Sequence, residues 1–531
     1  MKIGLFHSWE LTGSGSNEYA RYLGRALAGM GHEVHVFCRE PRPEKIEEAR
    51  RAFSWDGEGR PKEVFHRPGE KGFTLHVLPH HPKVRPVYVT DKQRPGPVKA
   101  FTDLGEAELR DWLEFSASSL GRALEAFPVE ILQANHLFPQ PWIAAKACAP
   151  LKIPYIVYPH GSSIEYTLRR DERFLPYARE GIEKARRLVS GSREVRDRIA
   201  RLFPELSEKI LEAPIVGVGV DTKLFAPLSR SERPRAIREI HALSPGGGKS
   251  PAQEAELKER LERGDLQALG DYKNAYDHGL PDAHVLEKLD SIPWEEARIL
   301  FFAGALTSGK GVQSLLGAMP SLLLRDPRVH LLVVGSGAYR EVLEAFLFAL
   351  AEGKTDLART LILRGFDLEE TALQGPWTDL AAWISDPKGE KELFSAGPEL
   401  ARHVHFLGRM NHSLLSKLFP CADLALFPSL LPEAYPLVLM ESLSAGVLPA
   451  ATDFSGFKEG LDELEPLLGK ELTGDLRLPL SPGERIRAIT RKTARLLTRL
   501  EARHPGPDLA RIAKERYDWT VRARQMTEVY R

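Results

Sequence analysis

The chain has 531 residues, with 73 basic and 73 acidic side chains, so its formal net charge at pH 7 is zero. This length is too great for one hydrophobic core and predicts two large domains with insertions. The charge balance gives no reason to expect nucleic acid as a partner. The cysteines, Cys38, Cys148 and Cys421, are too few and too scattered for a disulfide framework or a zinc site, and they are typical of a reducing cytosol.

The N-terminal stretch reaches its glycines too early for a signal peptide, and no run of about 18 apolar residues predicts a membrane span. We therefore expect a cytoplasmic protein and leave open a peripheral contact at the inner face of the membrane. A basic stretch over residues 168–187 could face an anionic lipid, but its interleaved acids favour a solvated face. The scarcity of Asn beside abundant Arg, Glu, Leu and Pro favours a thermophilic source.

In the first 220 residues, short β-rich runs alternate with helical patterns. Strands are predicted over residues 2–6, 33–37, 130–134, 155–158 and 187–190. Residues 228–295 break this pattern with polar, charged sequence, including an exposed helix near residues 254–264. Alternation then resumes with predicted strands at 298–306, 329–337, 403–408, 423–428 and 447–451, and residues 352–402 look like an irregular second insertion.

Strand–helix alternation predicts parallel, doubly wound sheets. We expect an α/β protein with two Rossmann-like domains, residues 1–227 and 296–505. Residues 228–295 would be a charged insertion or linker, and residues 506–531 a C-terminal helix. Ligands of such sheets bind at the carboxyl ends of the strands.

The segment FPSLLPEAYPLVLMESLSAG holds two carboxylates, Glu433 and Glu441, around an apolar run. It predicts a strand, a loop carrying Glu433, and a helix with Pro436 near its first position and Gly446 at its end. Amides near residues 434–437 would favour an anion, and carboxylates suit sugar hydroxyls, so the segment suits a sugar joined to a diphosphate. The alternative is a capping acid and a polar residue on a surface helix.

This segment resembles the E-x7-E region of the retaining family-4 glycosyltransferases, which have the two-domain GT-B fold. The resemblance implies that Glu433 contacts the donor sugar and that Glu441 holds the nucleotide ribose. Residues 434–436 read Ala-Tyr-Pro where the family usually has Gly-Phe-Gly, so a backbone contact is lost at Pro436.

The segment FFAGALTSGKG resembles the family pattern F-x-G-R-x-x-x-x-K-G, with Lys310 in place to neutralise the diphosphate. The family arginine is replaced by Ala305, and Arg409 is one cation that would substitute for it. YIVYPHG resembles the family strand that ends in His-Gly, which assigns His160 to the donor sugar; His136 is a weaker candidate on the acceptor side. The resemblance implies further donor contacts at Gly13, Gly15, Gly304, Gly335, Leu407, Gly408, Arg409, Tyr435, Pro436 and Leu437. A final helix that crosses back to the first domain is also implied.

These observations predict a retaining transferase that moves a hexose from a nucleotide sugar to a hydroxyl of a carbohydrate, lipid or small molecule. Glu433, His160 and Lys310 would be the catalytic residues. No D-x-D motif lies near a strand end, so we expect no metal and no cofactor.

Three alternatives remain. One is a glycosidase that uses Glu433 and Glu441 as its acid pair. The second is a nucleotide-sugar epimerase of the same fold. The third is an inactive nucleotide-sugar-binding protein, motivated by Ala305 and Pro436. The base, the sugar, the acceptor and the oligomeric state stay open.

Overall fold

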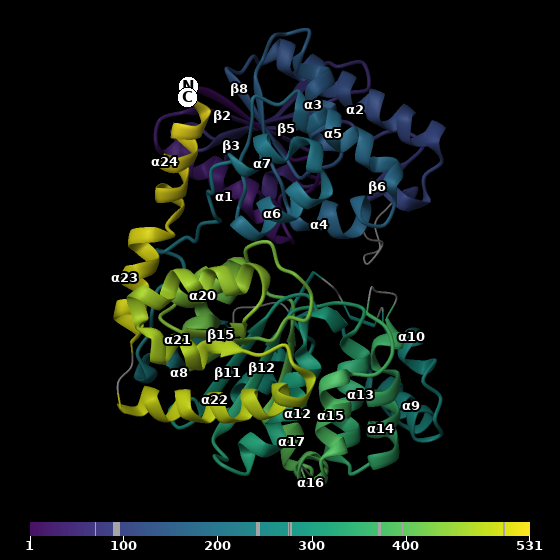
Figure 1. The fold of residues 1–531 in the computed structure, drawn as a ribbon, viewed down its shortest axis with the longest axis vertical. Coiled ribbons are helices and arrows are strands. Elements are labelled where there is room, and N and C mark those ends of the chain that lie inside the picture. Colours follow the sequence, from purple (N-terminus) through teal and green to yellow (C-terminus); the bar gives the residue numbers. More distant parts are fainter. Residues whose placement is uncertain are drawn as a thin grey trace. The chain divides into compact units, whose positions relative to one another are not determined.

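The computed structural model describes residues 1–69, 71–88, 96–240, 245–273, 275–276, 279–369, 373–395, 397–502 and 505–531. A few residues of both predicted insertions lie outside these ranges. The chain forms two compact units (Figure 1). Unit 1 contains Met1–Asp221, Ala434–Leu437 and Glu515–Arg531, and unit 2 contains Thr222–Glu433 and Val438–Lys514.

Unit 1 is built on an eight-stranded sheet in the order β10-β9-β8-β1-β2-β5-β3-β4. Every neighbouring pair is parallel except β3–β4. The strands are β1 (Lys2–Phe6), β2 (Glu33–Cys38), β3 (Ala49–Trp55), β4 (Pro61–His66), β5 (Phe73–Val77), β8 (Ile131–Asn135), β9 (Tyr155–Tyr158) and β10 (Arg187–Leu188). A separate pair joins β6 (Arg85–Val87) to β7 (Val98–Ala100).

The helices of unit 1 cover this sheet, and the C-terminal helix is one of them (Figure 1). Tyr530 at its end donates from its hydroxyl to Gln133 of β8 at 2.6 Å. Its main chain also joins the unit, because Trp519 N donates to Val220 O at 3.2 Å. The helices are α1 (Gly15–Gly29), α2 (Glu106–Ala126), α3 (Gln140–Cys148), α4 (Gly161–Ser163), α5 (Leu175–Glu183), α6 (Arg193–Leu202), α7 (Ser207–Leu211) and α24 (Trp519–Tyr530), with a π-helical turn at Ile164–Leu168.

Unit 2 contains a six-stranded parallel sheet in the order β13-β12-β11-β14-β15-β16. The strands are β11 (Arg298–Ala303), β12 (Val329–Val334), β13 (Val404–Gly408), β14 (Leu424–Phe427), β15 (Leu448–Thr452) and β16 (Arg477–Leu478). The strand order reverses between β11 and β14, so the topological switch point, where doubly wound sheets bind ligands, lies between these two strands. The two predicted Rossmann-like sheets are confirmed.

Most of the remaining unit 2 chain is helical. The helices are α8 (Arg233–Ile240), α9 (Pro251–Glu262), α10 (Ala268–Tyr272), α11 (Val285–Asp290), α12 (Val312–Leu323), α13 (Arg340–Ala351), α14 (Thr355–Arg364), α15 (Thr378–Ser385), α16 (Pro387–Phe394), α17 (Glu399–His403), α18 (His412–Leu418), α19 (Leu437–Ser444), α20 (Ser455–Leu468), α21 (Lys470–Leu476), α22 (Pro482–Ala502) and α23 (Gly506–Arg516).

One prediction of local structure was wrong, one predicted strand was too long, and three strands were missed. Residues 352–402 are not irregular, because α14 to α17 fill most of the described part of that segment and fully bury Trp377, whose indole donates to the Tyr339 hydroxyl at 2.8 Å. Strands β3, β4 and β5 were not predicted, and of these β4 is almost wholly exposed and shows no apolar alternation. The predicted strand at 187–190 is limited to its first two residues.

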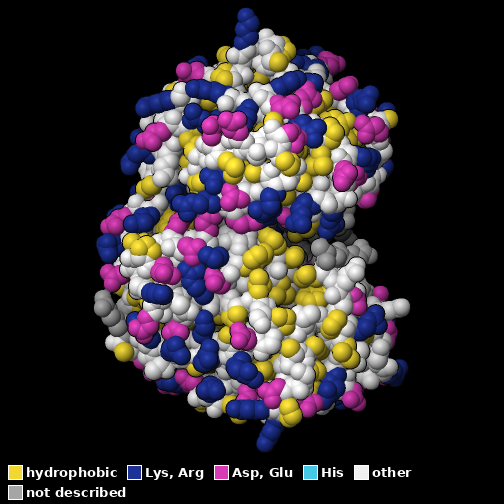
Figure 2. Space-filling view, in the orientation of Figure 1, with side chains coloured by type: hydrophobic (Ala, Val, Ile, Leu, Met, Phe, Trp, Pro, Cys, Tyr) yellow, Lys and Arg dark blue, Asp and Glu magenta, His cyan; other side chains and the backbone are white. Residues whose placement is uncertain are grey.

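The surface mixes both signs of charge. Figure 2 shows basic and acidic side chains interspersed over the visible face. In the basic stretch 168–187, Arg169 pairs with Glu165 at 3.2 Å and Arg173 with Asp171 at 2.7 Å, which is the mixed character of a solvated face. Among the described helices, none is both long and apolar enough to cross a membrane.

Candidate active site

The loops that follow β11 and β14 meet at the switch point of the unit 2 sheet. Leu430 N donates to Gly309 O at 2.7 Å and ties the two loops together. Gly311 has a φ of 75°, and a Cβ there would lie 1.9 Å from Pro428 O. Only glycine fits such a position, so the Gly311 of the Lys-Gly motif is required by the close approach of the loops.

This meeting point brings together Lys310 and Glu433, two of the predicted catalytic residues. Lys310 Nζ forms an ion pair with Glu433 Oε1, and Ser429 Oγ lies 3.1 Å from the same oxygen. The backbone of Glu433 is also held, because its carbonyl accepts hydrogen bonds from Ser455 Oγ at 2.8 Å and from Gly456 N at 3.0 Å. The side chains of Lys310 and Glu433 keep 33% and 20% of their surface exposed, so a ligand can reach both.

Glu441 lies in α19 and is buried, with 3% of its surface exposed. Its carboxylate is 3.0 Å from His412 Nε2, and the His412 ring packs edge-on against Phe225. Sequence reasoning missed His412, the first residue of α18. Its contact with Glu441 depends on how α18 packs near α19, which the sequence does not show.

Gly304 and Gly335 follow the neighbouring strands β11 and β12, and they lie in close contact. A Cβ on Gly335, whose φ is 150°, would lie 1.8 Å from Gly304 O. Gly335 N also donates to Gly408 O at 2.8 Å. The structure therefore brings three predicted donor residues together at the carboxyl ends of β11, β12 and β13.

Two main-chain groups of the predicted donor residues Leu407 and Arg409 are already hydrogen-bonded within the protein. Leu407 O accepts from Asp282 N at 2.9 Å, and Arg409 N donates to Leu280 O at 3.1 Å. The loop is thus partly paired with the segment of the first insertion around Pro281. Gly408, with a φ of 74°, permits this contact, because a Cβ there would lie 2.4 Å from Asp282 N.

Two polar side chains that sequence reasoning missed support the loops of this site. Arg485 is fully buried and donates from Nη2 to Pro428 O and from Nη1 to Pro479 O at 3.0 Å. Glu369 accepts from Ser308 N at 2.8 Å, beside Lys310, and burial raises the pKa of Glu369. Neither residue belongs to a recognisable motif, because each acts on a loop that is distant in sequence.

In unit 1, the glycine-rich turn precedes α1. Gly13 has a φ of 98°, which favours glycine, and Gly15 is the first residue of the helix. Ser14 caps the helix by accepting from Asn17 N, and Gly13 N lies 3.4 Å from Glu18 Oε1. An acid therefore already lies at this helix N-terminus, and the predicted phosphate contact there stays a prediction.

Three histidines gather at the carboxyl ends of β1, β8 and β9. The rings of His136 and His160 are 4.8 Å apart and those of His7 and His136 are 5.4 Å apart. His160 Nε2 lies 3.3 Å from Asn135 Oδ1. Burial lowers the pKa of all three, for His7 to about 4, so they are neutral at pH 7. His136 is 1% exposed and has no open surface for an acceptor in this structure, and the predicted role of His160 stays a prediction.

The remaining predicted donor residues, Tyr435, Pro436 and Leu437, group with unit 1. Next to them, Ala434 O accepts from Ser192 Oγ at 2.7 Å. Over the described chain, no cluster of three or more His, Cys, Asp or Glu side chains is arranged to hold a metal ion.

Two doubly wound, largely parallel sheets in separate units are the architecture of the GT-B fold. Solved structures of similar fold include sucrose-phosphate synthase of Thermosynechococcus elongatus (17% identity, TM-score 0.53, all of this chain and 98% of that one). Another is Anabaena HepE in complex with UDP-glucose (14% identity, TM-score 0.52, all of this chain and 99% of that one).

A family model described as glycosyl transferase 4-like domain matches residues 14–208, and one described as glycosyl transferases group 1 matches residues 388–469. The chain belongs to the family-4 glycosyltransferases. Among curated relatives, phosphatidyl-myo-inositol mannosyltransferase of Mycolicibacterium smegmatis is 23% identical over 277 residues, which is 50% of this chain and 54% of that protein. The Mycobacterium tuberculosis protein of the same name is 25% identical over 46% of this chain and 49% of its own. The matched region thus spans about half of these relatives.

Proposed function

We propose that the protein is a retaining glycosyltransferase that moves a hexose from a nucleotide sugar to an acceptor hydroxyl without a metal ion. The observation that carries this proposal is the contact of Lys310 with Glu433 at the β11–β14 switch point. A cation for the diphosphate and a carboxylate for the sugar hydroxyls lie at one partly exposed point, which is what a sugar–diphosphate linkage needs.

In the proposed reaction, the bond between the sugar C1 and the diphosphate oxygen breaks, and the acceptor oxygen bonds to C1 on the same face. The acceptor proton passes to the departing diphosphate oxygen, so the products are the glycoside and a nucleoside diphosphate. Lys310 stabilises the negative charge that develops on the diphosphate, and Glu433 accepts hydrogen bonds from the sugar hydroxyls. Glu441 accepts hydrogen bonds from the ribose.

The partner of the Lys310 ammonium group changes during this reaction. Lys310 is paired with Glu433 in the structure, so an incoming diphosphate competes with the Glu433 carboxylate for the ammonium group. Release of that carboxylate leaves its oxygens available to the sugar. Ser429 keeps Glu433 in position while the exchange takes place.

The proposed donor is a nucleotide sugar, and the proposed acceptor is a sugar or a lipid. The Anabaena protein of similar fold was solved with UDP-glucose, which supports a nucleotide-sugar donor. The mycobacterial relatives are named for transfer of mannose to phosphatidyl-myo-inositol, which favours a sugar or lipid acceptor.

The test is release of nucleoside diphosphate from UDP-, GDP- and ADP-sugars with a pool of acceptors. We expect release from one donor, stimulation by the acceptors, loss in Lys310→Ala, and product NMR that shows the anomeric configuration of the donor. Lys458→Ala is the matched control, because Lys458 is half exposed and pairs with Asp462 at 2.7 Å. Activity that survives in Lys310→Ala, or a product of inverted configuration, contradicts the proposal.

A further inference from the structure

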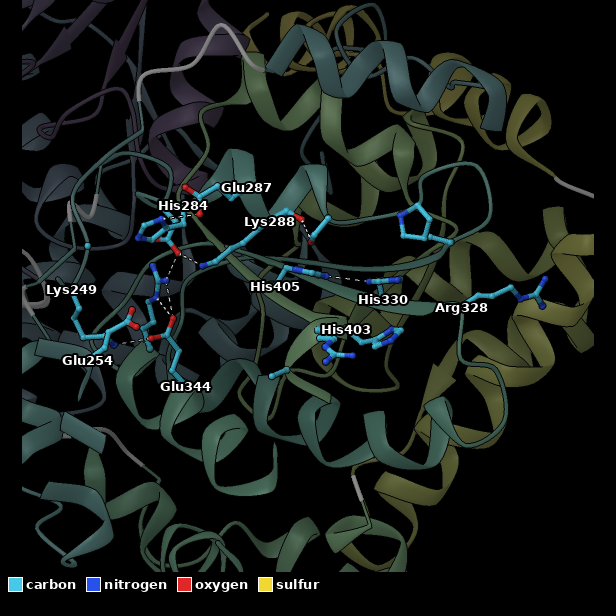
Figure 3. Close-up of a pocket in the computed structure, with 18 of the residues that line it drawn as sticks. Lys249, Glu254, His284, Glu287, Lys288, Arg328, His330, Glu344, His403 and His405 are labelled. Atoms are coloured by element: carbon cyan, nitrogen blue, oxygen red, sulfur yellow. Dashed lines mark hydrogen bonds and ion pairs between the residues drawn. The ribbon is translucent and has the colours of Figure 1, made fainter. Parts of the chain in front are cut away.

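A cavity of about 750 Å³ lies in unit 2 beside β12 and β13 (Figure 3). Its walls come from the first insertion, from α13 and α17, from β12 and β13, and from the segment just before β12. The predicted donor residues are not part of its lining. Its volume is in the range of small-molecule sites.

One end of the cavity carries alternating charges, and Figure 3 shows Lys249 and Glu344 at this end, apart from His330, His403 and His405. Lys249 Nζ is 2.9 Å from Glu344, and Arg340 lies 2.8 Å from Glu344 and 2.7 Å from Asp282. Lys288 Nζ is 2.6 Å from Asp282. Each of these cations therefore already has a carboxylate partner.

The middle of the cavity is lined by three imidazoles. The His330 ring lies 4.4 Å from that of His403 and 5.5 Å from that of His405, and His330 Nδ1 is 3.2 Å from His405 Nε2. His403 donates from Nδ1 to Val329 O at 2.8 Å. Burial lowers the pKa of His330 to about 4 and that of His405 to about 3, so both are neutral at pH 7. A neutral imidazole offers one donor and one acceptor.

At the rim of the cavity, the cations are again paired with carboxylates. Arg328 pairs with Asp326 at 2.8 Å, and Arg402 pairs with Glu399 at 2.6 Å. The exposed acid Glu287 lies at the charged end (Figure 3). An anionic ligand would have to compete with carboxylates for the cations, and an apolar ligand would leave polar groups of the wall unpaired, which is costly.

We propose that this cavity is a second binding site, separate from the donor site, for a neutral polyhydroxylated ligand of the sugar or oligosaccharide class. Each hydroxyl both donates and accepts a hydrogen bond, which matches neutral imidazoles beside paired charges. The ligand lies along β13, with its hydroxyls on His330, His403 and His405. The site depends on the first insertion, so it is a property of this chain beyond its two sheets.

The test is calorimetric titration of the full chain with maltose, sucrose and trehalose, and with inorganic phosphate as the anionic probe. We expect at least one disaccharide to bind in the millimolar range or tighter, and its affinity to be unchanged in Lys310→Ala. His405→Phe and the less buried His403→Phe should each weaken binding about tenfold, the change expected when one hydrogen bond is lost.

His35→Phe is the matched control, because His35 Nδ1 lies 2.9 Å from His76 Nε2 in a similar buried pair of unit 1. It should leave disaccharide binding unchanged, and thermal melting shows that each variant is folded. The proposal is overturned if no disaccharide binds the folded wild type at millimolar concentration, if phosphate displaces the bound sugar, or if Lys310→Ala abolishes binding and so assigns the sugar to the donor site.

Discussion

His412 Nε2 lies 3.0 Å from Glu441 Oε1, and both side chains are largely withdrawn from solvent. This contact fixes the orientation of the carboxylate that we assign to the nucleotide ribose. His412→Gln should therefore raise the dissociation constant for the nucleoside diphosphate about fivefold to tenfold, with a smaller effect on kcat. Calorimetry and steady-state kinetics measure the two quantities separately.

The control is His81→Gln, because His81 also pairs with an acid, Asp111, at 3.3 Å, but does so in unit 1. Nucleotide affinity should not change in this variant. Equal effects of the two substitutions, or a loss of kcat alone in His412→Gln, would contradict the role assigned to His412.

Ser429 lies 3.1 Å from Glu433 Oε1 and is 3% exposed, so we treat it as a positioning residue. Ser429→Ala should lower kcat about tenfold and leave the dissociation constant of the nucleoside diphosphate unchanged, because the free nucleotide lacks the sugar that Glu433 contacts. Ser442→Ala removes an equally buried hydroxyl, bonded to Val447 O at 2.7 Å, and should leave kcat near wild type. A Ser429 effect on nucleotide affinity alone would refute this assignment.

Arg485 is fully buried and lies 3.5 Å from the buried carboxylate of Asp379. Arg485→Met leaves that carboxylate without its cation, so we expect unit 2 to lose about 3 kcal/mol of stability. Arg487→Met, two residues away, removes an exposed cation that pairs with Asp386 at 3.0 Å and should cost less than about 1 kcal/mol. Calorimetric unfolding measures the stability loss in each variant, because it can separate the transitions of the two units. Similar losses in the two variants would show that Arg485 does not support the loop.

Glu180 joins α5 to α3 and carries the clearest pH dependence of stability. Burial raises its pKa, but hydrogen bonds from Lys146, Lys184 and Trp142 outweigh this effect and lower the pKa from 4.5 to about 2. The carboxylate thus stabilises the fold above pH 4.5, and this contribution is lost as the pH falls from 4.5 to 2. Glu180→Gln should lower the melting temperature at pH 7, and its difference from wild type should shrink across that window.

The neighbouring exposed Glu183 provides the comparison for this experiment. Glu183→Gln should leave the melting temperature close to wild type at every pH. A difference between Glu180→Gln and wild type that stays constant down to pH 2 would mean that the three donors do not act through the Glu180 charge.

The sequence predicted both sheets because their central strands are short, continuously apolar and separated by helices. It failed for β4, whose residues Pro61–His66 are exposed and charged, and for α14 to α17, which are short helices broken by Gly and Pro. It indicated Lys310 and Glu433 through motifs, but their ion pair joins residues 123 positions apart, and only the order of β11 and β14 brings them together. His412 and Arg485 belong to no such motif, so only the packing of distant helices and loops identifies them.

The contact of Pro281 and Asp282 with Gly408 and Leu407 has a consequence for solubility. β13 is the outermost strand of its sheet, and an open edge strand is a template for pairing with another chain. The insertion covers the C-terminal end of this edge with its own backbone, and Lys288 Nζ donates to Phe406 O at 2.9 Å on the same strand. The insertion therefore protects the protein from edge-to-edge aggregation. Removing it would expose unpaired backbone groups of β13 and would also remove the walls of the cavity.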